Sequence, residues 1–205
     1  MGCTTEFTGR VTVEPPLNPD EIAYLTKFAR TRRMHRNNGP YFVDGSGAYG
    51  QGRDADIIEF NSEPPEQPGL WCRWVPTEDG AGIEWDGGEK FYDADRWMAY
   101  LIDTFLKSGA TVQGELAVPV DGRVYHDAFE RFTFDHVVNG RIEAQGERDD
   151  DHWTLVVVDN EVSVEKYPTM AERMESDPDL AVAVERLRQA RVTVSQFAAL
   201  TGQEY

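Results

Sequence analysis

Alternating apolar and polar positions predict a first strand, and a helical period predicts the element after it. Phe7, Val11 and Val13 alternate with polar neighbours, which is typical of a strand with one buried face. The run 18–21, Asn-Pro-Asp-Glu, then supplies an N-cap residue, a proline in the first turn and acidic residues near the helix start. The apolar stripe that follows predicts a helix to about Arg30.

The stretch 69–107 holds four of the five tryptophans and organises the rest of the chain. Large aromatic side chains bury the most area per residue, so we expect this stretch to form the centre of the core. Its pattern predicts a strand at 70–75, a hairpin turn at 78–80 and a return strand at 81–86. Asp93 is expected to cap a helix that ends at the 108–109 Ser-Gly pair.

The second half of the chain is weakly patterned at first and then strongly patterned. Residues 110–134 predict at most a short hairpin around Asp121-Gly122. After Asn139-Gly140, alternation predicts three strands, at 141–147, 153–158 and 161–166, with a tight turn at Asp159-Asn160. From Tyr167 onward the composition changes, and the run Asp177-Pro178-Asp179 predicts the start of a helix to about residue 190, with a short second helix at 195–200.

Together these elements predict an α+β fold with a ferredoxin-like βαββαβ core, an antiparallel sheet, an added C-terminal hairpin and a short helical tail. The expected domain organisation is a core domain at 1–167, with a glycine-rich loop excursion at 37–67, followed by the helical tail at 168–205.

The net charge narrows the classes of partner. The chain has 20 Lys and Arg residues against 37 Asp and Glu residues, a formal net charge of −17. Such a charge repels phosphate backbones and anionic lipid, so direct binding of nucleic acid or membrane is not expected. It favours cationic partners or divalent metal. The acidic surface could also imitate nucleic acid and occupy a protein that binds it, or simply be a solvated surface.

Cysteine content and hydropathy indicate a cytoplasmic protein. Cys3 and Cys72 are the only cysteines, which excludes a disulfide framework and a cysteine-rich zinc site. No apolar run approaches the roughly 18 residues of a membrane span. The four histidines have no metal-ligand spacing, and no catalytic motif is present.

A basic segment and the glycine-rich run beside it are candidates for binding a small anionic, nucleotide-like ligand. Arg32, Arg33 and Arg36 lie in a segment without acids, and guanidinium groups bind phosphate and carboxylate bidentately. Gly47 and Gly50 belong to a run that formally matches G-x-G-x-x-G but lacks the strand and helix of a dinucleotide site. The arginines could equally pair with the protein's own carboxylates, and the run could be a surface loop.

Trp71 and Arg73 extend this candidate site. Residues 71, 73 and 75 share one face of the predicted strand, and Cys72 and Trp74 share the other. If one face is core, either Trp71 or Trp74 is exposed. A tryptophan exposed beside Arg73 would form a stacking platform for an aromatic ligand, unless the tail or the long loop covers it.

Glu84, Asp86 and Glu89 are the candidates for acid or metal chemistry. Two of them share a strand face, so their carboxylates could hold a divalent cation. The alternative is a solvated sheet face. No other cofactor is expected.

The run at 69–80, GLWCRWVPTEDG, the run at 83–106, IEWDGGEKFYDADRWMAYLIDTFL, the preceding KFARTRRMHR and the later VVNGRIEAQGE resemble a family of uncharacterised proteins found in actinobacterial and phage genomes. The likeness covers most of residues 4–166. The family carries no catalytic assignment, so the resemblance implies only a small intracellular protein that mobile elements often carry.

Three functions follow as hypotheses. The first is a cytoplasmic, phage-related binding protein without catalytic activity, an inhibitor or sponge of a host factor or of a small anionic ligand. The second is a metal-assisted hydrolase or nucleotide-modifying enzyme. The third is a structural or regulatory module that forms a homodimer through its C-terminal helices.

Overall fold

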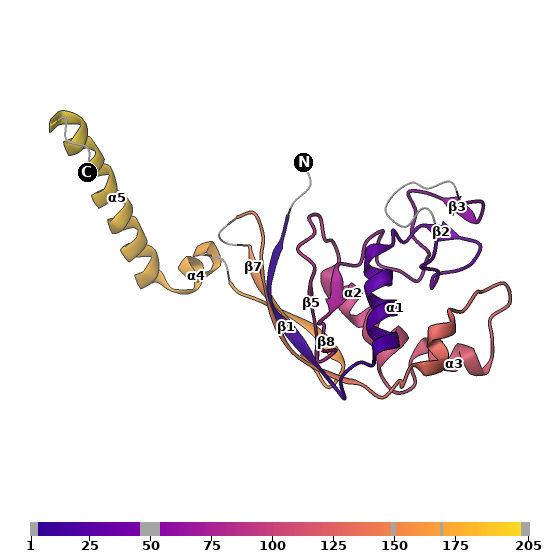
Figure 1. Cartoon of the computed structure of the whole chain (residues 1–205). Helices are drawn as coiled ribbons and strands as arrows, with labels where there is room; N and C mark the ends of the chain where they lie inside the picture. Colours follow the sequence, from indigo (N-terminus) through magenta and orange to yellow (C-terminus); the bar gives the residue numbers. More distant parts are fainter. Residues whose placement is uncertain (1–3, 46–53, 149–150, 169, 202–205) are drawn as a thin grey trace. The chain divides into compact units, whose positions relative to one another are not determined.

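The protein, seen here as a computed structural model, divides into two compact units, Met1–Lys166 and Tyr167–Tyr205. The structure describes residues 4–45, 54–148, 151–168 and 170–201. The first unit is a mixed α+β domain built on one six-stranded antiparallel sheet (Figure 1). The second unit contains the helices α4 (Met170–Ser176) and α5 (Pro178–Thr201).

The sheet has the strand order β4-β5-β1-β6-β7-β8, and every neighbouring pair is antiparallel. Its longest strands lie at the centre, where side chains from both flanking strands can pack. The strands are β1 (Glu6–Glu14), β4 (Trp74–Pro76), β5 (Gly82–Trp85), β6 (Val137–Gln145), β7 (His152–Val158) and β8 (Glu161–Lys166).

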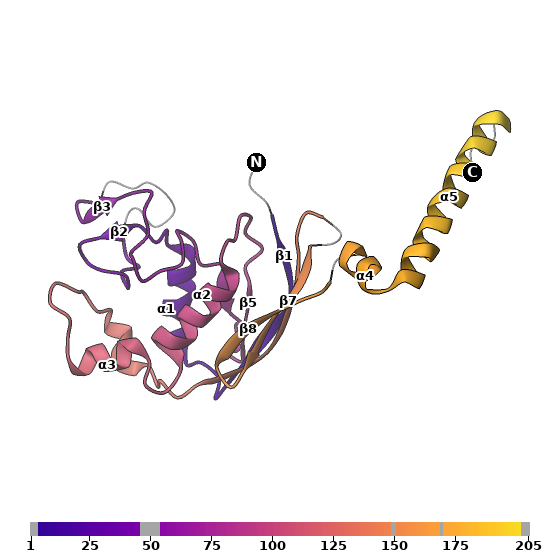
Figure 2. The same ribbon diagram turned by 180° about the vertical axis from the view of Figure 1, so that it is seen from behind.

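Two helices cover one side of this sheet, as the opposite views in Figures 1 and 2 both show. Helix α1 (Pro19–Arg30) begins with a complete capping box. The Asn18 side chain accepts the Glu21 backbone N–H, and the Glu21 side chain accepts the Asn18 backbone N–H. Helix α2 (Ala94–Leu101) continues into the π-helical turn η1 (Ile102–Leu106).

The core lies between the helices and the inward face of the sheet. Phe7, Val11 and Val13 of β1 are buried there, as their alternation predicts. The opposite face of the sheet carries polar side chains, including the ion pair between Arg141 and Glu165. The predicted core stretch is confirmed, because Trp74 and Trp97 are among the largest fully buried side chains.

Two expectations about the 69–107 stretch are wrong in detail. The first strand begins at Trp74, not at residue 70, so residues 70–73 lie outside the sheet. Asp93 occupies the N-cap position with a left-handed backbone (φ 52°) but makes no side-chain capping bond. Its carboxylate pairs with Arg96 instead, at 3.4 Å.

Residues 110–134 form helices in place of the predicted hairpin. Helix α3 (Thr111–Ala117) and the 3₁₀ helix η2 (Asp127–Arg131) flank an exposed loop. The glycine at 122 (φ 75°) shapes that loop but joins no strands. Within 37–67, the short strand β3 (Ile57–Glu59) pairs with β2 (His35–Arg36), which gives this excursion a small sheet of its own.

The tail differs from its prediction in having one long second helix. Helix α5 continues from Pro178 through Thr201 without the break expected near residue 190. Val182 and Leu187 are exposed on it. In the described ranges, no helix combines the length and apolarity that crossing a membrane requires. The homodimer through these helices stays a prediction.

Asn139-Gly140 is not a boundary but lies inside β6, where Gly140 is paired with Val11 of β1. Its φ of 146° is one that side chains rarely adopt, and a Cβ there would lie 2.9 Å from the Val11 Cα atom. Glycine is therefore required by the close approach of two backbones at the centre of the sheet.

We expect Gly140→Val to lower the free energy of unfolding by on the order of 1–3 kcal/mol, because neither the φ value nor the space admits a side chain. Urea unfolding measures this loss. Gly122→Val is the matched control, since Gly122 also has positive φ (75°) but faces open space. Equal losses for the two variants would show that the close approach to Val11 costs nothing.

Candidate functional site

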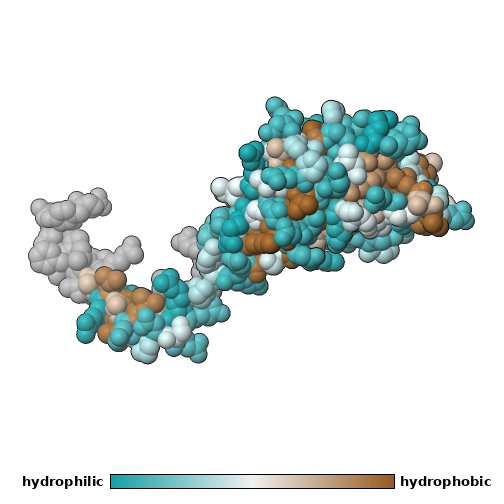
Figure 3. Space-filling model, turned by 90° about the horizontal axis from the view of Figure 1, so that it is seen from below, coloured by the Kyte–Doolittle hydropathy of each residue, from teal (hydrophilic) through white to brown (hydrophobic). Residues whose placement is uncertain are grey.

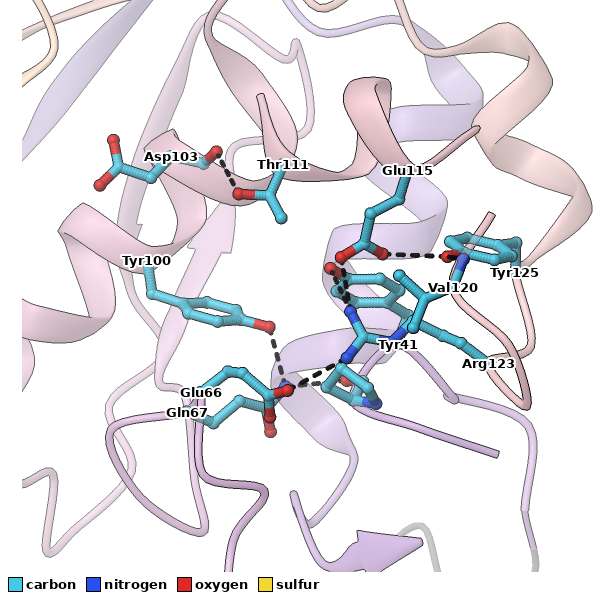
Figure 4. Close-up of polar contacts among 11 residues, drawn as sticks. Tyr41, Glu66, Gln67, Tyr100, Asp103, Thr111, Glu115, Val120, Arg123 and Tyr125 are labelled. Carbon is cyan, nitrogen blue, oxygen red and sulfur yellow. Dashed lines mark hydrogen bonds and ion pairs between the residues drawn. The ribbon is translucent and has the colours of Figure 1, made fainter. Parts of the chain in front are cut away.

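A cleft of about 420 Å³ lies beside α3 and is lined in part by the end of α2. It is assembled from segments far apart in the chain, and Figure 4 shows how their side chains converge. Its lining comes from the segment after β2, the end of the 37–67 excursion, the end of α2 with η1, and α3 with its following loop: Tyr41, Glu66, Tyr100, Asp103, Thr104, Thr111, Glu115, Val120 and Arg123.

Arg123 joins two carboxylates across this cleft. Its Nη1 donates to Glu115 Oε1 at 2.5 Å, and its Nη2 donates to Glu66 Oε1 at 3.0 Å. The guanidinium carbon lies 5.2 Å from the centre of the Tyr41 ring, within cation–π range. Only 15% of the Arg123 side chain is exposed. Burial lowers its pKa, but the hydrogen bond and ion pair with Glu115 outweigh burial and raise it overall.

The two carboxylates are held differently. Glu115 is 14% exposed and also accepts a hydrogen bond from the Tyr125 hydroxyl at 3.1 Å. Glu66 is 50% exposed and projects from a loop. Glu115 is therefore a buried anchor for Arg123, whereas Glu66 is a solvent-screened partner.

Phenol and amide groups complete the polar lining. Gln67 donates to the Tyr100 hydroxyl at 3.0 Å and to the Pro40 carbonyl at 2.8 Å. Burial raises the pKa of Tyr100 to about 12 and raises that of Tyr41 further. Both phenols therefore stay neutral at physiological pH and act as hydrogen-bonding groups.

Asp103 lines the cleft with its backbone and not with its charge. Its carbonyl accepts a hydrogen bond from the Thr111 hydroxyl at 3.3 Å. Its carboxylate points away from the cleft in Figure 4 and pairs with Lys107 at 2.6 Å. The charges that face the cleft are thus those of Glu66, Glu115 and Arg123.

Exposed aliphatic side chains form what we call the apolar rim; among them Val120 lines the cleft, and Val124 lines a neighbouring cavity. The rim consists of four side chains on α3 and the loop after it: Leu116, Val118, Val120 and Val124, with exposed fractions of 36%, 77%, 43% and 48%. Figure 3 views the molecule from the side on which α3 lies in Figure 1, and brown apolar patches there interrupt the hydrophilic surface.

A second, smaller cavity of about 200 Å³ shares Tyr41 with the cleft. In it His126 Nε2 lies 3.1 Å from Asp44 Oδ2, and Lys27 pairs with the other Asp44 oxygen at 2.7 Å. His126 Nδ1 accepts the Ala128 N–H, so this nitrogen carries no proton and Nε2–H donates to Asp44. His126 thus acts as the N-cap of η2.

The predicted arginine cluster is brought together but is turned inward. Arg33 is 2% exposed, and its Nη2 donates to the carbonyls of Pro40 and Phe42 at 2.9 and 2.8 Å. Burial lowers its pKa. Arg36 is 3% exposed and pairs with the carboxylates of Asp54 and Asp56, each at 3.0 Å.

The other residues of the predicted anion site are engaged or not described. Arg32 donates to the Asn61 side chain at 2.9 Å. Gly47 and Gly50 lie outside the described residues. Arg73 lies 4.9 Å from the centre of the Trp71 ring and 3.4 Å from Asp86, so the protein's own arginine occupies the face of the half-buried tryptophan.

The predicted metal ligands are exposed and dispersed. Glu84 lies opposite Arg10 in the sheet, and Asp86 accepts hydrogen bonds from Arg73 and the Gly88 N–H. Glu89 is exposed in the loop before α2. Within the described ranges, no three His, Cys, Asp or Glu side chains are grouped as metal ligands. The divalent-cation site and the enzyme function stay predictions.

Sequence reasoning did not find the cleft. Its charged residues are separated by 57 positions between Glu66 and Arg123. Neither lies in a recognisable motif, and the loop that carries Arg123 belongs to the weakly patterned region. The run 116–124 offers a partial signal, because exposed aliphatic residues gathered at a helix end and in the loop after it are typical of an interaction surface.

No protein-family model, curated protein or solved structure matches the chain. The resemblance to the actinobacterial and phage family stays an expectation.

Proposed function

We propose that this protein is an acidic binding protein without catalytic activity that takes up a basic segment of another protein and thereby inhibits it. The observation that carries the proposal is the charge of the cleft: two carboxylates face it, and Arg123 is the one cation among its described lining residues. A cationic group entering the cleft meets a net negative site with aromatic walls.

The charge of the whole chain supports the same partner class. The net charge of −17 attracts basic surfaces over a distance and speeds their association. The arginines considered for anion binding already contact groups of the protein itself: Arg33 contacts carbonyls, Arg36 contacts two aspartates and Arg73 contacts Trp71 and Asp86. Their guanidinium nitrogens without a hydrogen-bond partner are buried. A nucleotide would have to displace the groups that these arginines contact.

The strand arrangement supports a ferredoxin-like core, which we propose as the finer description of the fold. The order β4-β5-β1-β6 places the first and third strands of a βαββαβ unit side by side, with the fourth and second strands outside them. The hairpin β7-β8 then extends the sheet at the β6 edge. A cytoplasmic location and a phage-related origin belong to the same proposal.

Calorimetric titration of the purified protein with a lysine- and arginine-rich peptide tests the function. We expect micromolar binding that weakens as ionic strength rises, because the attraction is largely electrostatic. A glutamate-rich peptide of equal length and ATP serve as controls and should not bind. ATP binding without peptide binding, or a nucleotide released from the purified protein by heating, would favour the small anionic ligand instead.

A further inference from the structure

We propose that the cleft is a receptor for one arginine side chain of a partner's extended segment, and that this side chain replaces Arg123 between Glu66 and Glu115. The apolar rim of residues 116, 118, 120 and 124 holds the aliphatic neighbours of that arginine. This inference rests on the proposed function and names the residue that the partner contributes.

Arg123 itself demonstrates what the cleft binds. A guanidinium group presents parallel donors in a plane, and it prefers carboxylate partners at its edges and an aromatic ring at its face. Glu115 and Glu66 occupy two edges of the Arg123 group, and the Tyr41 ring lies 5.2 Å from its centre. The cleft therefore already places carboxylate acceptors and an aromatic ring where a guanidinium group binds them.

Exchange is favoured by the position of Arg123 in the chain. It follows Asp121 and Gly122, which are both exposed, in the loop between α3 and η2. Its bond to Glu66 joins it to a side chain that is half exposed, and such screened pairs contribute little stability. An incoming guanidinium can take over Glu66 first, while Glu115 still holds Arg123.

The cleft has room for the incoming group. Its volume of about 420 Å³ lies in the range of roughly 300–1,000 Å³ that is usual for pockets binding small groups. Beyond Arg123, Figure 4 shows the Tyr100 hydroxyl pointing toward the Glu66 side of the same space. This neutral oxygen can accept a guanidinium N–H group.

The rim explains why an extended segment, and not a free cation, is the expected ligand. Val120 lines the cleft and is 43% exposed, and it lies in the same loop as Val118 and Val124, which are 77% and 48% exposed. Aliphatic residues flanking the partner's arginine would bury this surface. Charge complementarity in the cleft and apolar contact on the rim then act on the same short segment.

Titration of acetyl-Gly-Val-Arg-Val-Gly-amide into wild type and variants tests the proposal. Glu66→Gln should weaken binding about threefold to fivefold, because one solvent-screened, charge-assisted hydrogen bond is lost. Arg123→Gln should tighten binding, since the competing guanidinium is gone. Glu84→Gln removes the same charge from the opposite face of the sheet and should change the affinity less than about twofold.

Control peptides separate this inference from the general function. Citrulline in place of arginine keeps the shape but not the charge, and should not bind. If the arginine peptide binds equally to wild type, Glu66→Gln and Arg123→Gln, the cleft is not the site, although the binding function stands. If no basic peptide binds, both proposals fail. If a glutamate peptide binds wild type and binds the Arg123→Gln variant more weakly, the proposal that the cleft binds a cationic side chain is wrong.

A rescue experiment tests the site without any peptide. Arg123→Ala leaves Glu115 and Tyr41 without their guanidinium, and millimolar methylguanidinium should raise the Tm of this variant but not that of wild type. Methylammonium at the same concentration should do less, because it lacks the planar fork. An equal shift for both proteins would show general salt binding and overturn the guanidinium site.

Discussion

Replacing His136 by glutamine should lower the free energy of unfolding by about 3–5 kcal/mol, because the change leaves a buried carboxylate without its cation. The side chains of Glu21 and His136 are both fully buried, with Nε2 lying 3.2 Å from Oε1. His136 Nδ1 faces the Pro15 carbonyl at 2.7 Å, which only accepts, so Nδ1 carries a proton, while Nε2 faces the Glu21 carboxylate and the Thr133 hydroxyl. Thr133 and Asn18 donate backbone N–H groups to the same carboxylate.

The pair also gives stability a definite pH dependence. Burial lowers the pKa of His136, but its bonds to Glu21 and Pro15 outweigh burial and raise it above the usual 6.5. Burial raises the pKa of Glu21, but the bonds from His136, Thr133 and Asn18 outweigh it and lower the pKa below the usual 4.5. The contribution of the pair is therefore complete between pH 4.5 and 6.5.

Above this window, stability is lost as pH rises through the raised pKa of His136; below it, stability is lost as pH falls through the lowered pKa of Glu21. The measurement is urea unfolding across pH, comparing wild type with the double variant Glu21→Gln/His136→Gln so that other groups cancel. A stability difference that stays flat from pH 5 to pH 9 would show that the pair is not ionised.

Trp74→Ala should cost about 3–5 kcal/mol, the range for removing a large aromatic side chain from a packed core. Trp74 is 1% exposed and packs edge-on against Phe7 and Phe91 at 5.2 and 5.1 Å. Its indole N–H donates to the Ala94 carbonyl at 2.8 Å, which ties β4 to the start of α2.

Trp71→Ala is the matched control and should cost about 1 kcal/mol or less, the order of an exposed cation–π contact. Trp71 is half-buried and its contact with Arg73 lies at the surface. Urea unfolding of both variants, followed by fluorescence of the remaining tryptophans, gives the two values. Similar losses would mean that Trp71 supports the core as much as Trp74 does.

Sequence periodicity predicts those parts of the fold in which local pattern and tertiary packing agree. The start of α1 is such a place, since Asn18 and Glu21 form the capping box that their spacing indicates. The tight turn at Asp159-Asn160 is another, with positive φ values of 48° and 73° as a two-residue hairpin requires. Each of these features is decided within a few residues.

Other parts depend on contacts that the local pattern does not contain. Gly140 looks like a turn residue, yet it lies in β6 because Val11 of β1 approaches it closely. The basic segment looks like a surface, yet Arg33 and Arg36 are buried, where carbonyls and aspartates supplied by later residues pair with part of each guanidinium group. The cleft around Arg123 depends on four separate segments, so no single stretch indicates it.

Tyr41 gives these two cavities a common wall. Its ring lies under Arg123 in the larger cleft, and the same residue lines the smaller cavity that contains His126. Its carbonyl also accepts the hydroxyl of buried Tyr24 at 2.9 Å, which holds its backbone to α1. The ring also packs edge-on against Phe105 and Phe129 of the core. Any coupling between the two cavities through this ring has to act equally in both directions, because coupling free energies are reciprocal.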